Sequence, residues 1–180
     1  HRLQYRVTRN STWLRESWPV IEGCAQFWAG RATPCNRTLH PGDNFTVLGV
    51  IGADERAGIV DDDAYTNALV AETLKYAGWV AGQVGAVPGA NWSSIATGML
   101  LPVVKGIYDG GAVHLENRQY KAGQMTEQSD VVLLQYPLLL DMPPELKAND
   151  LAYWENHTFP NGFYTGDSSY AIAWMAIGRR

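Results

Sequence analysis

Two segments of this 180-residue chain are apolar on nearly every face if they form helices. They are VVLLQYPLLL at residues 131–140 and SSYAIAWMAIG at residues 168–178. A helix that is apolar all round must be covered by protein on every side. The segments at residues 20–28 and 65–80 instead carry one apolar stripe at helical spacing. We therefore expect an all-α fold with an α/α arrangement, in which outer helices surround inner ones.

Start and stop signals place the remaining elements along the chain. We predict that the first amphipathic helix has Pro19 in its first turn and ends at Gly30. Residues 103–125 are rich in Gly and lack clean periodicity, which indicates loops and short strands. The other predicted helices cover residues 64–81, 93–100, 129–140, 144–154 and 167–178. No repeat and no long linker divides the chain, so residues 1–180 are predicted to form a single unit.

The charge and composition of the chain exclude several classes of protein. A net charge of −4 leaves no basic surface for a phosphate backbone, so we expect no nucleic-acid partner. No apolar run approaches the roughly 20 residues that a membrane span needs, so we expect no membrane insertion. An apolar content of 46% with 18% charged residues is typical of a globular domain.

Asparagine usage points to the secretory pathway. Five of the nine asparagines begin an Asn-x-Ser/Thr sequence, which is far more than chance would give. This pattern predicts a surface position for each of the five and a secreted, cell-wall, periplasmic or vacuolar location. Cys24 and Cys35 suit either an oxidising compartment or burial, so a disulfide between them stays open. The predicted glycosylation acceptors are Asn10, Asn36, Asn44, Asn91 and Asn156.

The segment GADERAGIVDDDAYTNALV, at residues 52–70, contains five carboxylates that call for different explanations. Asp61, Asp62 and Asp63 directly precede a predicted helix, where side-chain oxygens cap free N–H groups and suit the helix dipole. Their spacing lacks the alternation and the central Gly of a calcium loop, so we expect no metal there. Asp54 and Glu55 lie instead on a Gly-bounded turn after an apolar run. A solvated turn would explain them, and so would a general acid whose pKa is raised by its surroundings.

Few other chemical motifs are present. His114 and Glu116 alternate, but two residues do not make a metal site. The chain has no Gly-x-Ser-x-Gly elbow, P-loop or Gly-x-Gly-x-x-Gly sequence, and we expect no cofactor. What remains is a pair of acids in an aromatic-rich helical protein. This combination suits hydrolysis of a glycoside, which needs a protonated acid, a second carboxylate and aromatic surfaces to hold the sugar.

The acidic motif resembles the Gly-Pro-Asp-Glu-Tyr segment, with its following Tyr-Thr-Asn, of glycoside hydrolase family 65. WPVIEGCAQFWAGRA is similar to the helix before this motif, EQSDVVLLQYPLLL to the family's Lys-Gln-Ala-Asp helix, and YWEN with AIAWMAIG to its closing helices. The matches follow the family's order along the chain, and their residues look most like those of fungal acid trehalases. The resemblance implies an (α/α)6 barrel, of which this chain would supply roughly the C-terminal half. The N-terminal part of the same protein is then an expected partner.

The resemblance also implies roles for single residues. Glu55 occupies the general-acid position, and Glu155 in YWEN matches the general base that activates water. Inversion requires their carboxyl groups to lie about 6.5 to 9.5 Å apart. Gln128 matches the glutamine of a sugar-binding Lys-Gln pair whose lysine position holds Glu127 here. Asp54 is a neighbouring candidate for substrate binding.

We therefore predict an inverting glycosidase that hydrolyses an α-glucoside, with trehalose as the first candidate. One alternative is a family relative that acts on another α-glucoside, such as glucosylgalactosyl-hydroxylysine. Another is a non-catalytic, glycosylated carbohydrate-binding fragment, because Ala53 and Arg56 stand where the family has Pro and Tyr. A phosphorylase is disfavoured, because the Glu155 carboxylate would repel phosphate.

Overall fold

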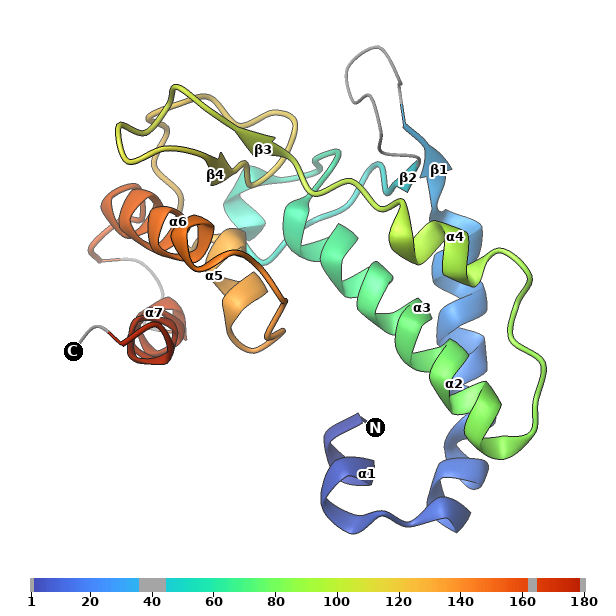
Figure 1. The fold of residues 1–180 in the computed structure, drawn as a ribbon. Helices are drawn as coiled ribbons and strands as arrows, with labels where there is room; N and C mark the ends of the chain where they lie inside the picture. The colour runs from blue at the N-terminus through green and yellow to red at the C-terminus, as the bar shows by residue number, and fades with distance from the viewer. Residues whose placement is uncertain (1, 36–44, 162–164, 179–180) are drawn as a thin grey trace. The chain divides into compact units, whose positions relative to one another are not determined.

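The computed structural model describes residues 2–35, 45–161 and 165–178 (Figure 1). Helices make up 54% of the structure, so the predicted all-α class is confirmed. The chain divides into two compact units: unit 1 holds residues 1–46 and 69–99, and unit 2 holds residues 47–68 and 100–180. Within the described ranges, no helix has both the length and the apolarity needed to cross a membrane.

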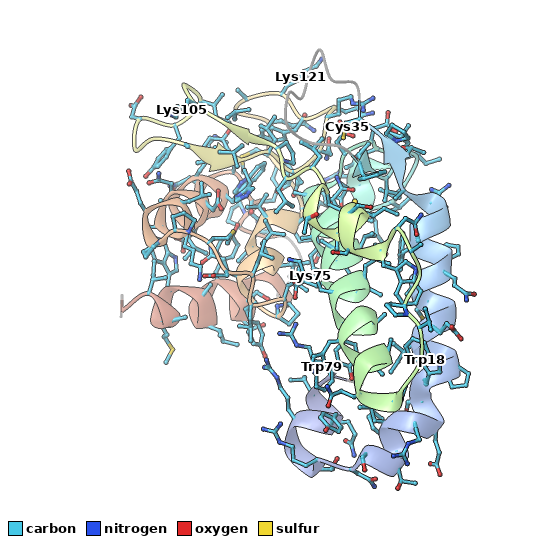
Figure 2. All side chains as sticks on the ribbon, turned by 45° about the vertical axis from the view of Figure 1, so that its right-hand side comes forward. Trp18, Cys35, Lys75, Trp79, Lys105 and Lys121 are labelled. Carbon is cyan, nitrogen blue, oxygen red and sulfur yellow. The ribbon has the colours of Figure 1, made fainter. Side chains whose placement is uncertain are left out.

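Unit 1 is built mainly from helices. Helix α2 contacts both α1 and α4. Trp18 on α2 is labelled in Figure 2. Its ring lies 6.3 Å from the ring of Trp92 at the start of α4, so aromatic packing joins these two helices. The elements of unit 1 are α1 (Arg2–Thr8), α2 (Ser11–Arg31), most of α3 (Ala64–Val84), α4 (Trp92–Thr97) and the antiparallel pair β1 (Thr33–Pro34) and β2 (Phe45–Thr46).

Helix α2 begins at Ser11, earlier than the predicted start near Pro19. The Asn10 side chain accepts a hydrogen bond from the Trp13 N–H at 3.0 Å and caps this earlier start. Pro19 therefore lies inside the helix, on its exposed side, where it removes one backbone hydrogen bond. The predicted start is wrong because the asparagine cap and the packing of the first two turns outweigh that loss.

The buried face of α2 is correspondingly rotated from the predicted stripe. Val20 and Phe27 belong to the predicted stripe but are 57% and 59% exposed. Cys24 on this helix is exposed, Cys35 after β1 is buried, and no disulfide joins them. The residues of α2 that are buried are Leu14, Ser17, Ile21 and Ala25, at helical spacing.

Unit 2 packs three helices around one apolar core (Figure 1). Helices α5, α6 and α7 each contact the other two. Leu134, Leu151 and Trp154 are fully buried between them, and burial of side chains of this size contributes about 1.5–3 kcal/mol each. The elements of unit 2 are the 3₁₀ turn η1 (Glu55–Ala57), β3 (Val103–Val104) paired antiparallel with β4 (Val113–His114), α5 (Asp130–Gln135), α6 (Pro144–Asn156) and α7 (Thr165–Ala176).

Helix α5 is largely buried, but it is shorter than predicted, and the prediction of burial on every side is wrong for the residues after it, where Leu139 is 65% exposed. Its residues Val131, Val132 and Leu134 are all buried. The helix ends at Gln135 rather than at residue 140, because proline disfavours helical backbone at the residue before it and Pro137 follows the helix.

Helix α7 has nearly the predicted bounds but not the predicted burial. Tyr170 and Ala173 are buried, whereas Ile172 and Met175 are 40% and 70% exposed. Helices α5 and α6 cover one side of α7 in unit 2. The prediction that this helix is covered on every side is therefore wrong for the described chain.

Candidate active site

The acidic motif forms a closed loop that exposes Glu55 to solvent. Val50 and Val60 pair through two backbone hydrogen bonds of 2.9 and 2.8 Å, which close the loop at its base. The turn η1 lies midway between them, and the Asp54 side chain caps it by accepting from the Arg56 N–H at 3.2 Å. Asp54 is buried and Glu55 is exposed, so the loop presents one of its two adjacent acids outward.

Side chains from one segment hold the backbone of this loop. The Asp130 carboxyl accepts from the Ala53 N–H at 3.1 Å and from the Asp54 N–H at 2.7 Å. The Gln128 side-chain amide donates to the Ala53 carbonyl oxygen. Asp130 is the first residue of α5, whose N-cap is Ser129. The start of a buried helix therefore fixes the backbone that precedes Glu55.

Four carboxyl groups around the base of the loop are buried: Asp54, Asp63, Glu116 and Asp130. Glu116 accepts from the Asp130 N–H at 2.7 Å. Asp63 accepts from the Thr66 N–H at 2.6 Å and so caps α3. Within the described ranges, no group of three His, Cys, Asp or Glu side chains is arranged to hold a metal ion.

Burial raises the pKa of three of these groups, Glu116, Asp130 and Asp54. It raises the pKa of Glu116 to about 8, although the bond from the Asp130 N–H opposes the shift. Burial, together with the facing Asp63, also raises the pKa of Asp130. The pKa of Asp54 is raised by burial too, against the effect of two backbone N–H groups. The loop is therefore packed against carboxyl groups whose raised pKa values favour the protonated form.

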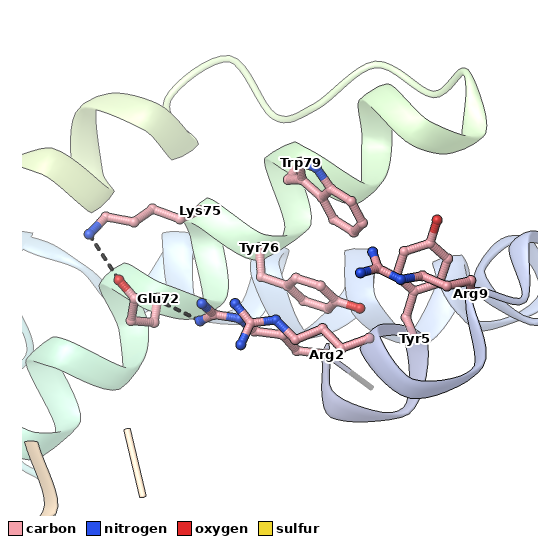
Figure 3. Close-up of a pocket in the computed structure, with 8 residues that line it drawn as sticks. Arg2, Tyr5, Arg9, Glu72, Lys75, Tyr76 and Trp79 are labelled. Carbon is pink, nitrogen blue, oxygen red and sulfur yellow. Dashed lines mark hydrogen bonds and ion pairs between the residues drawn. The ribbon is translucent and has the colours of Figure 1, made fainter. Parts of the chain in front are cut away.

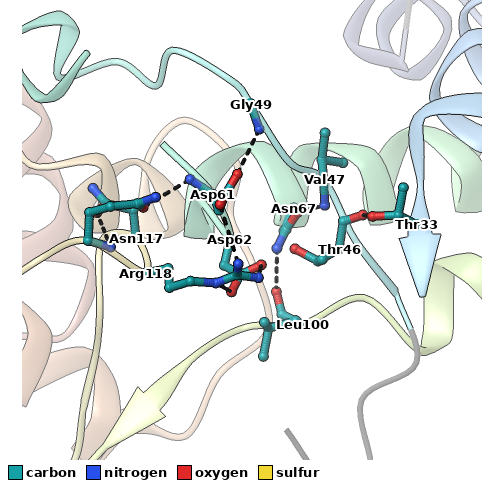
Figure 4. A network of polar contacts seen from close by, with 11 residues as sticks. Thr33, Thr46, Val47, Gly49, Asp61, Asp62, Asn67, Leu100, Asn117 and Arg118 are labelled. Carbon is teal, nitrogen blue, oxygen red and sulfur yellow. Dashed lines mark hydrogen bonds and ion pairs between the residues drawn. The ribbon is translucent and has the colours of Figure 1, made fainter. Parts of the chain in front are cut away.

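Of the three consecutive aspartates, Asp63 caps α3 as predicted, but its neighbours have other partners. Asp62 forms a two-bond ion pair with Arg118, at 2.7 and 3.0 Å (Figure 4). Asp61 accepts from the Gly49 N–H at 2.9 Å and lies 3.3 Å from the same guanidinium group. The capping prediction is wrong for Asp61 and Asp62, because Arg118 and the loop backbone take their carboxylates.

Glu155, the predicted base, is exposed in the last turn of α6. The Trp174 indole N–H on α7 donates to one of its carboxylate oxygens at 3.1 Å. An indole has a single donor in a fixed direction, so this bond orients the Glu155 carboxylate.

One contact connects the residues after α6 with the Glu55 loop, and a second set connects them with the segment that leads to Glu127 and Gln128. Thr126 exchanges backbone hydrogen bonds with His157 and Phe159, at 2.8 and 2.9 Å. The Arg56 guanidinium lies 5.7 Å from the centre of the Phe159 ring. The structure thus brings together, within unit 2, the two elements that carry Glu55 and Glu155.

Two of the three residues predicted to bind substrate contact the loop, and the third, Asp54, lies within it. Glu127 forms an ion pair with Arg56 at 2.5 Å. Gln128 is bonded to the loop backbone through its amide. Their role in binding sugar stays a prediction. The ion pair also accounts for Arg56 and Glu127 occurring together, since each neutralises the charge of the other.

The predicted glycosylation sites are partly within the described chain. Asn10, Asn91 and Asn156 are exposed, as an acceptor asparagine must be. Asn36 and Asn44 lie outside the described residues. Glycosylation itself stays a prediction.

A cavity of about 400 Å³ lies in unit 1 between α1 and α3 (Figure 3). Its lining is basic and aromatic, and includes Arg9, Tyr76 and Trp79. Glu72 is the one carboxylate in this lining, and it is bound by Arg2 and Lys75. A site with a single paired carboxylate does not suit acid–base hydrolysis, so the candidate active site is the Glu55 loop.

Sequence analysis did not identify Asp130 or Trp174 as site residues. A Ser-Asp pair before an apolar run is explained by the start of a helix, so the sequence gives no sign that Asp130 also binds the Glu55 loop. Trp174 fits the apolar pattern of its helix in the same way. Contacts across 76 and 19 residues of sequence leave no trace in local periodicity.

Comparison with known proteins gives several homologues. No protein-family profile matches the chain. The chain is 32% identical over 161 residues to a protein-glucosylgalactosylhydroxylysine glucosidase of Danio rerio, covering 88% of this chain and 23% of that protein. It is 36% identical over 158 residues to a kojibiose hydrolase of Mucilaginibacter mallensis, covering 87% and 22%. An acid trehalase of Emericella nidulans is 30% identical over 176 residues, covering 97% and 16%.

One solved structure, described as a kojibiose phosphorylase from the human microbiome, has a similar fold. The TM-score is 0.71 at 14% identity, over 95% of this chain and 28% of that chain. At this identity the likeness concerns the fold alone, which is consistent with part of an (α/α)6 barrel.

The predicted resemblance to family 65 is supported by these homologues, but acid trehalase is not the most similar of them. The chain spans about a quarter of the length of the first two relatives, at 23% and 22%. By sequence and by fold, the chain is thus a homologue of family 65-like glycoside hydrolases.

Proposed function

We propose that the protein containing this chain hydrolyses an α-glucoside, with Glu55 as general acid and Glu155 as general base. Relatives named as a glucosidase, a kojibiose hydrolase and an acid trehalase support the reaction class. The observation that carries the assignment of Glu55 is its exposure on a loop whose backbone is held by Asp130. A general acid must be kept within hydrogen-bond reach of the leaving oxygen, and this loop has the necessary fixed backbone.

In the proposed reaction, Glu55 gives its proton to the glycosidic oxygen as the bond to the anomeric carbon breaks. Glu155 takes a proton from water, and the water oxygen attacks the anomeric carbon from the opposite face. This single displacement inverts the configuration, so an α-glucoside yields β-glucose first. The Trp174 indole N–H orients Glu155 for its part. Both acids are exposed, so solvent can restore their protonation states.

The substrate that we propose first is kojibiose or a glucosylgalactosyl-hydroxylysine unit, with trehalose second. The relatives named for the first two sugars are 36% and 32% identical to this chain, and the acid trehalase is 30% identical. This order reverses the expectation drawn from the sequence motifs.

The proposal is tested by assaying the full-length protein on kojibiose, glucosylgalactosyl-hydroxylysine and trehalose. We expect glucose release from at least one of them, and a fall in kcat on the order of 10²- to 10⁴-fold for Glu55→Gln. Glu145→Gln changes an exposed carboxylate in the first turn of α6 and is the matched control. Full turnover by Glu55→Gln would rule out its role as the acid.

A second candidate is a glycosylated protein that binds sugar without cleaving it. The ion pair between Arg56 and Glu127 favours it, because the Glu127 side chain, at the position of the family's sugar-binding lysine, is bound by Arg56. This candidate predicts sugar binding by the full-length protein with no glucose release. The same three substrates therefore separate the two candidates.

We also propose that the protein passes through the secretory pathway. Its sequons support this location, and so does similarity to a cell wall acid trehalase of Arthroderma benhamiae, which is 29% identical over 67% of this chain and covers 11% of that protein. A fall in mass after enzymatic removal of N-linked glycans from the native protein tests it. An unchanged mass would contradict it.

A further inference from the structure

Two buried carboxyl groups meet against Gly52, at the start of the Glu55 loop. A methyl group added at Gly52 would collide with Asp130 Oδ2 and would lie 2.7 Å from Asp63 Oδ2. Both oxygens therefore approach the same side of the Gly52 Cα atom. Only glycine leaves room for them, which explains this glycine without any special backbone angle.

The hydrogen bonds of the two groups leave one oxygen unaccounted for. Asp63 Oδ1 accepts from the Thr66 N–H, and the two Asp130 oxygens accept from the loop N–H groups of Ala53 and Asp54. Asp63 Oδ2 is buried and has no N–H or hydroxyl partner among the described residues. A buried carboxylate oxygen without a donor costs the full free energy of its desolvation.

We propose that Asp63 and Asp130 share one proton, donated from Asp130 Oδ2 to Asp63 Oδ2, and that this pair positions the Glu55 loop. A protonated carboxyl has one O–H donor and still accepts through its oxygens, so Asp130 keeps both bonds to the loop backbone. The shared proton supplies the missing donor for Asp63 Oδ2. It also replaces repulsion between two buried charges by a strong, charge-assisted hydrogen bond.

The groups around the pair favour retention of this proton. Burial is the largest cause of the raised pKa of Asp130, followed by its bond to Asp63 and the charges of Asp63 and Glu116. Tyr65 on α3 also faces the pair, and both aspartates raise its pKa. Asp54 on the loop is a further acid, and its charge acts on Glu116. The bond from the Asp54 N–H lowers the pKa of Asp130, but burial and the acidic neighbours outweigh it, which disfavours a second negative charge there.

The pair connects three parts of unit 2 at one point. Asp63 caps α3, Asp130 begins α5, and their shared proton lies against the residue that starts the Glu55 loop. A displacement of either carboxyl would therefore move Ala53 and Asp54 and, with them, Glu55. The effect on catalysis rests on the proposed role of Glu55, whereas the shared proton does not.

The proton is tested by the pH dependence of unfolding of the full-length protein. Asp63→Asn keeps a cap oxygen for α3 and offers an N–H to an ionised Asp130, so the proton is no longer needed. Above pH 8, where Glu116 is ionised, we expect the wild type to lose thermal stability with rising pH more steeply than Asp63→Asn. Parallel curves would overturn the shared proton.

A measurement on the wild type alone gives a second test, in case Asp63→Asn does not fold. In the same pH range the infrared spectrum should keep the carbonyl stretch of a buried protonated carboxyl group. Absence of that band would overturn the proposal.

The positioning role is tested by Gly52→Ala, with Gly78→Ala as the matched control because nothing lies within 4 Å of a methyl group added at Gly78. We expect kcat to fall by at least about tenfold for Gly52→Ala with KM little changed, since misplacement of the acid by about 1 Å can cost 100-fold. Equal kcat values in the two variants would overturn the positioning role. An active Glu55→Gln enzyme would instead overturn the proposed function and leave the unfolding and infrared results intact.

Discussion

Glu116 shows how a single buried carboxyl group makes folding depend on pH. Its pKa rises from 4.5 to about 8 on burial, so the folded state binds a proton that the unfolded state releases in this range. The stabilisation is complete below pH 4.5 and is lost as the pH rises towards 8. The loss is on the order of a few kcal/mol.

We predict that Glu116→Gln flattens this pH dependence. The glutamine oxygen can still accept from the Asp130 N–H but the side chain cannot ionise. Equilibrium unfolding between pH 4.5 and 8 measures the effect, with the exposed Glu145→Gln as control. Identical slopes for wild type and Glu116→Gln would contradict the burial of a protonated acid.

The hydrogen bond from Trp174 to Glu155 gives a prediction for the proposed general base. Trp174→Phe keeps an aromatic ring and removes the N–H that orients Glu155, so we expect kcat to fall on the order of tenfold. The melting temperature should change little, because Glu155 is exposed and its hydrogen bond competes with water. Trp79→Phe in unit 1 is the control for loss of an indole. An unchanged kcat would exclude an orienting role for Trp174.

At the residue scale, the roles of Glu55 and Glu155 stay predictions, and the sequence did not predict the side chains that contact them or their loop. Residue patterns alone are consistent with two roles for Glu55, a solvated turn residue or a general acid. The family resemblance favours the general acid. The exposure of Glu55 and the fixed backbone before it are consistent with both roles. The contacts of Asp130 could not be predicted, because they depend on tertiary packing across 76 residues.

At the element scale, the start of α2 is a test of local capping. We predict that Asn10→Ala destabilises the first turn by about 1 kcal/mol, because the Trp13 N–H loses its acceptor. Thr12→Ala removes the same glycosylation sequence but keeps the cap, so it is the matched control. Hydrogen exchange of the Trp13 and Leu14 amides should quicken in Asn10→Ala alone. Equal exchange in both variants would contradict the cap.

Element prediction succeeded where local signals agreed and failed where they competed. Asp63 and the apolar stripe after it both predict α3, which begins at Ala64. For α2, Pro19 predicted a start that the structure does not have, because the Asn10 cap and the packing of Leu14 and Ser17 extend the helix back to Ser11. The apolar pattern of α7 predicts which faces of the helix can be buried. The faces that are buried depend on the neighbouring helices, which the pattern does not reveal.

At the scale of the whole molecule, the exposed face of α7 is notable because this chain matches about a quarter of its relatives' length. Ile172 and Met175 on that face are apolar side chains of the kind that a longer protein could cover. We expect the N-terminal part of the protein to cover them, as an (α/α)6 barrel implies. The resemblance to family 65 implied this incompleteness, because it predicted that the chain supplies roughly the C-terminal half of the barrel.

The most direct test of the account follows hydrolysis by the full-length protein with nuclear magnetic resonance. On glucosylgalactosyl-hydroxylysine, or on the methyl glycoside of kojibiose, the second sugar is not released as free glucose, so all free glucose comes from the bond that is cleaved. On these substrates we predict that β-glucose forms first, and that Glu55→Gln slows its formation on the order of 10²- to 10⁴-fold while the protein still folds. The initial anomer tests the paired roles of Glu55 and Glu155, and the variant tests the acid itself. Initial release of α-glucose, or release at the wild-type rate by the folded Glu55→Gln protein, would contradict the account.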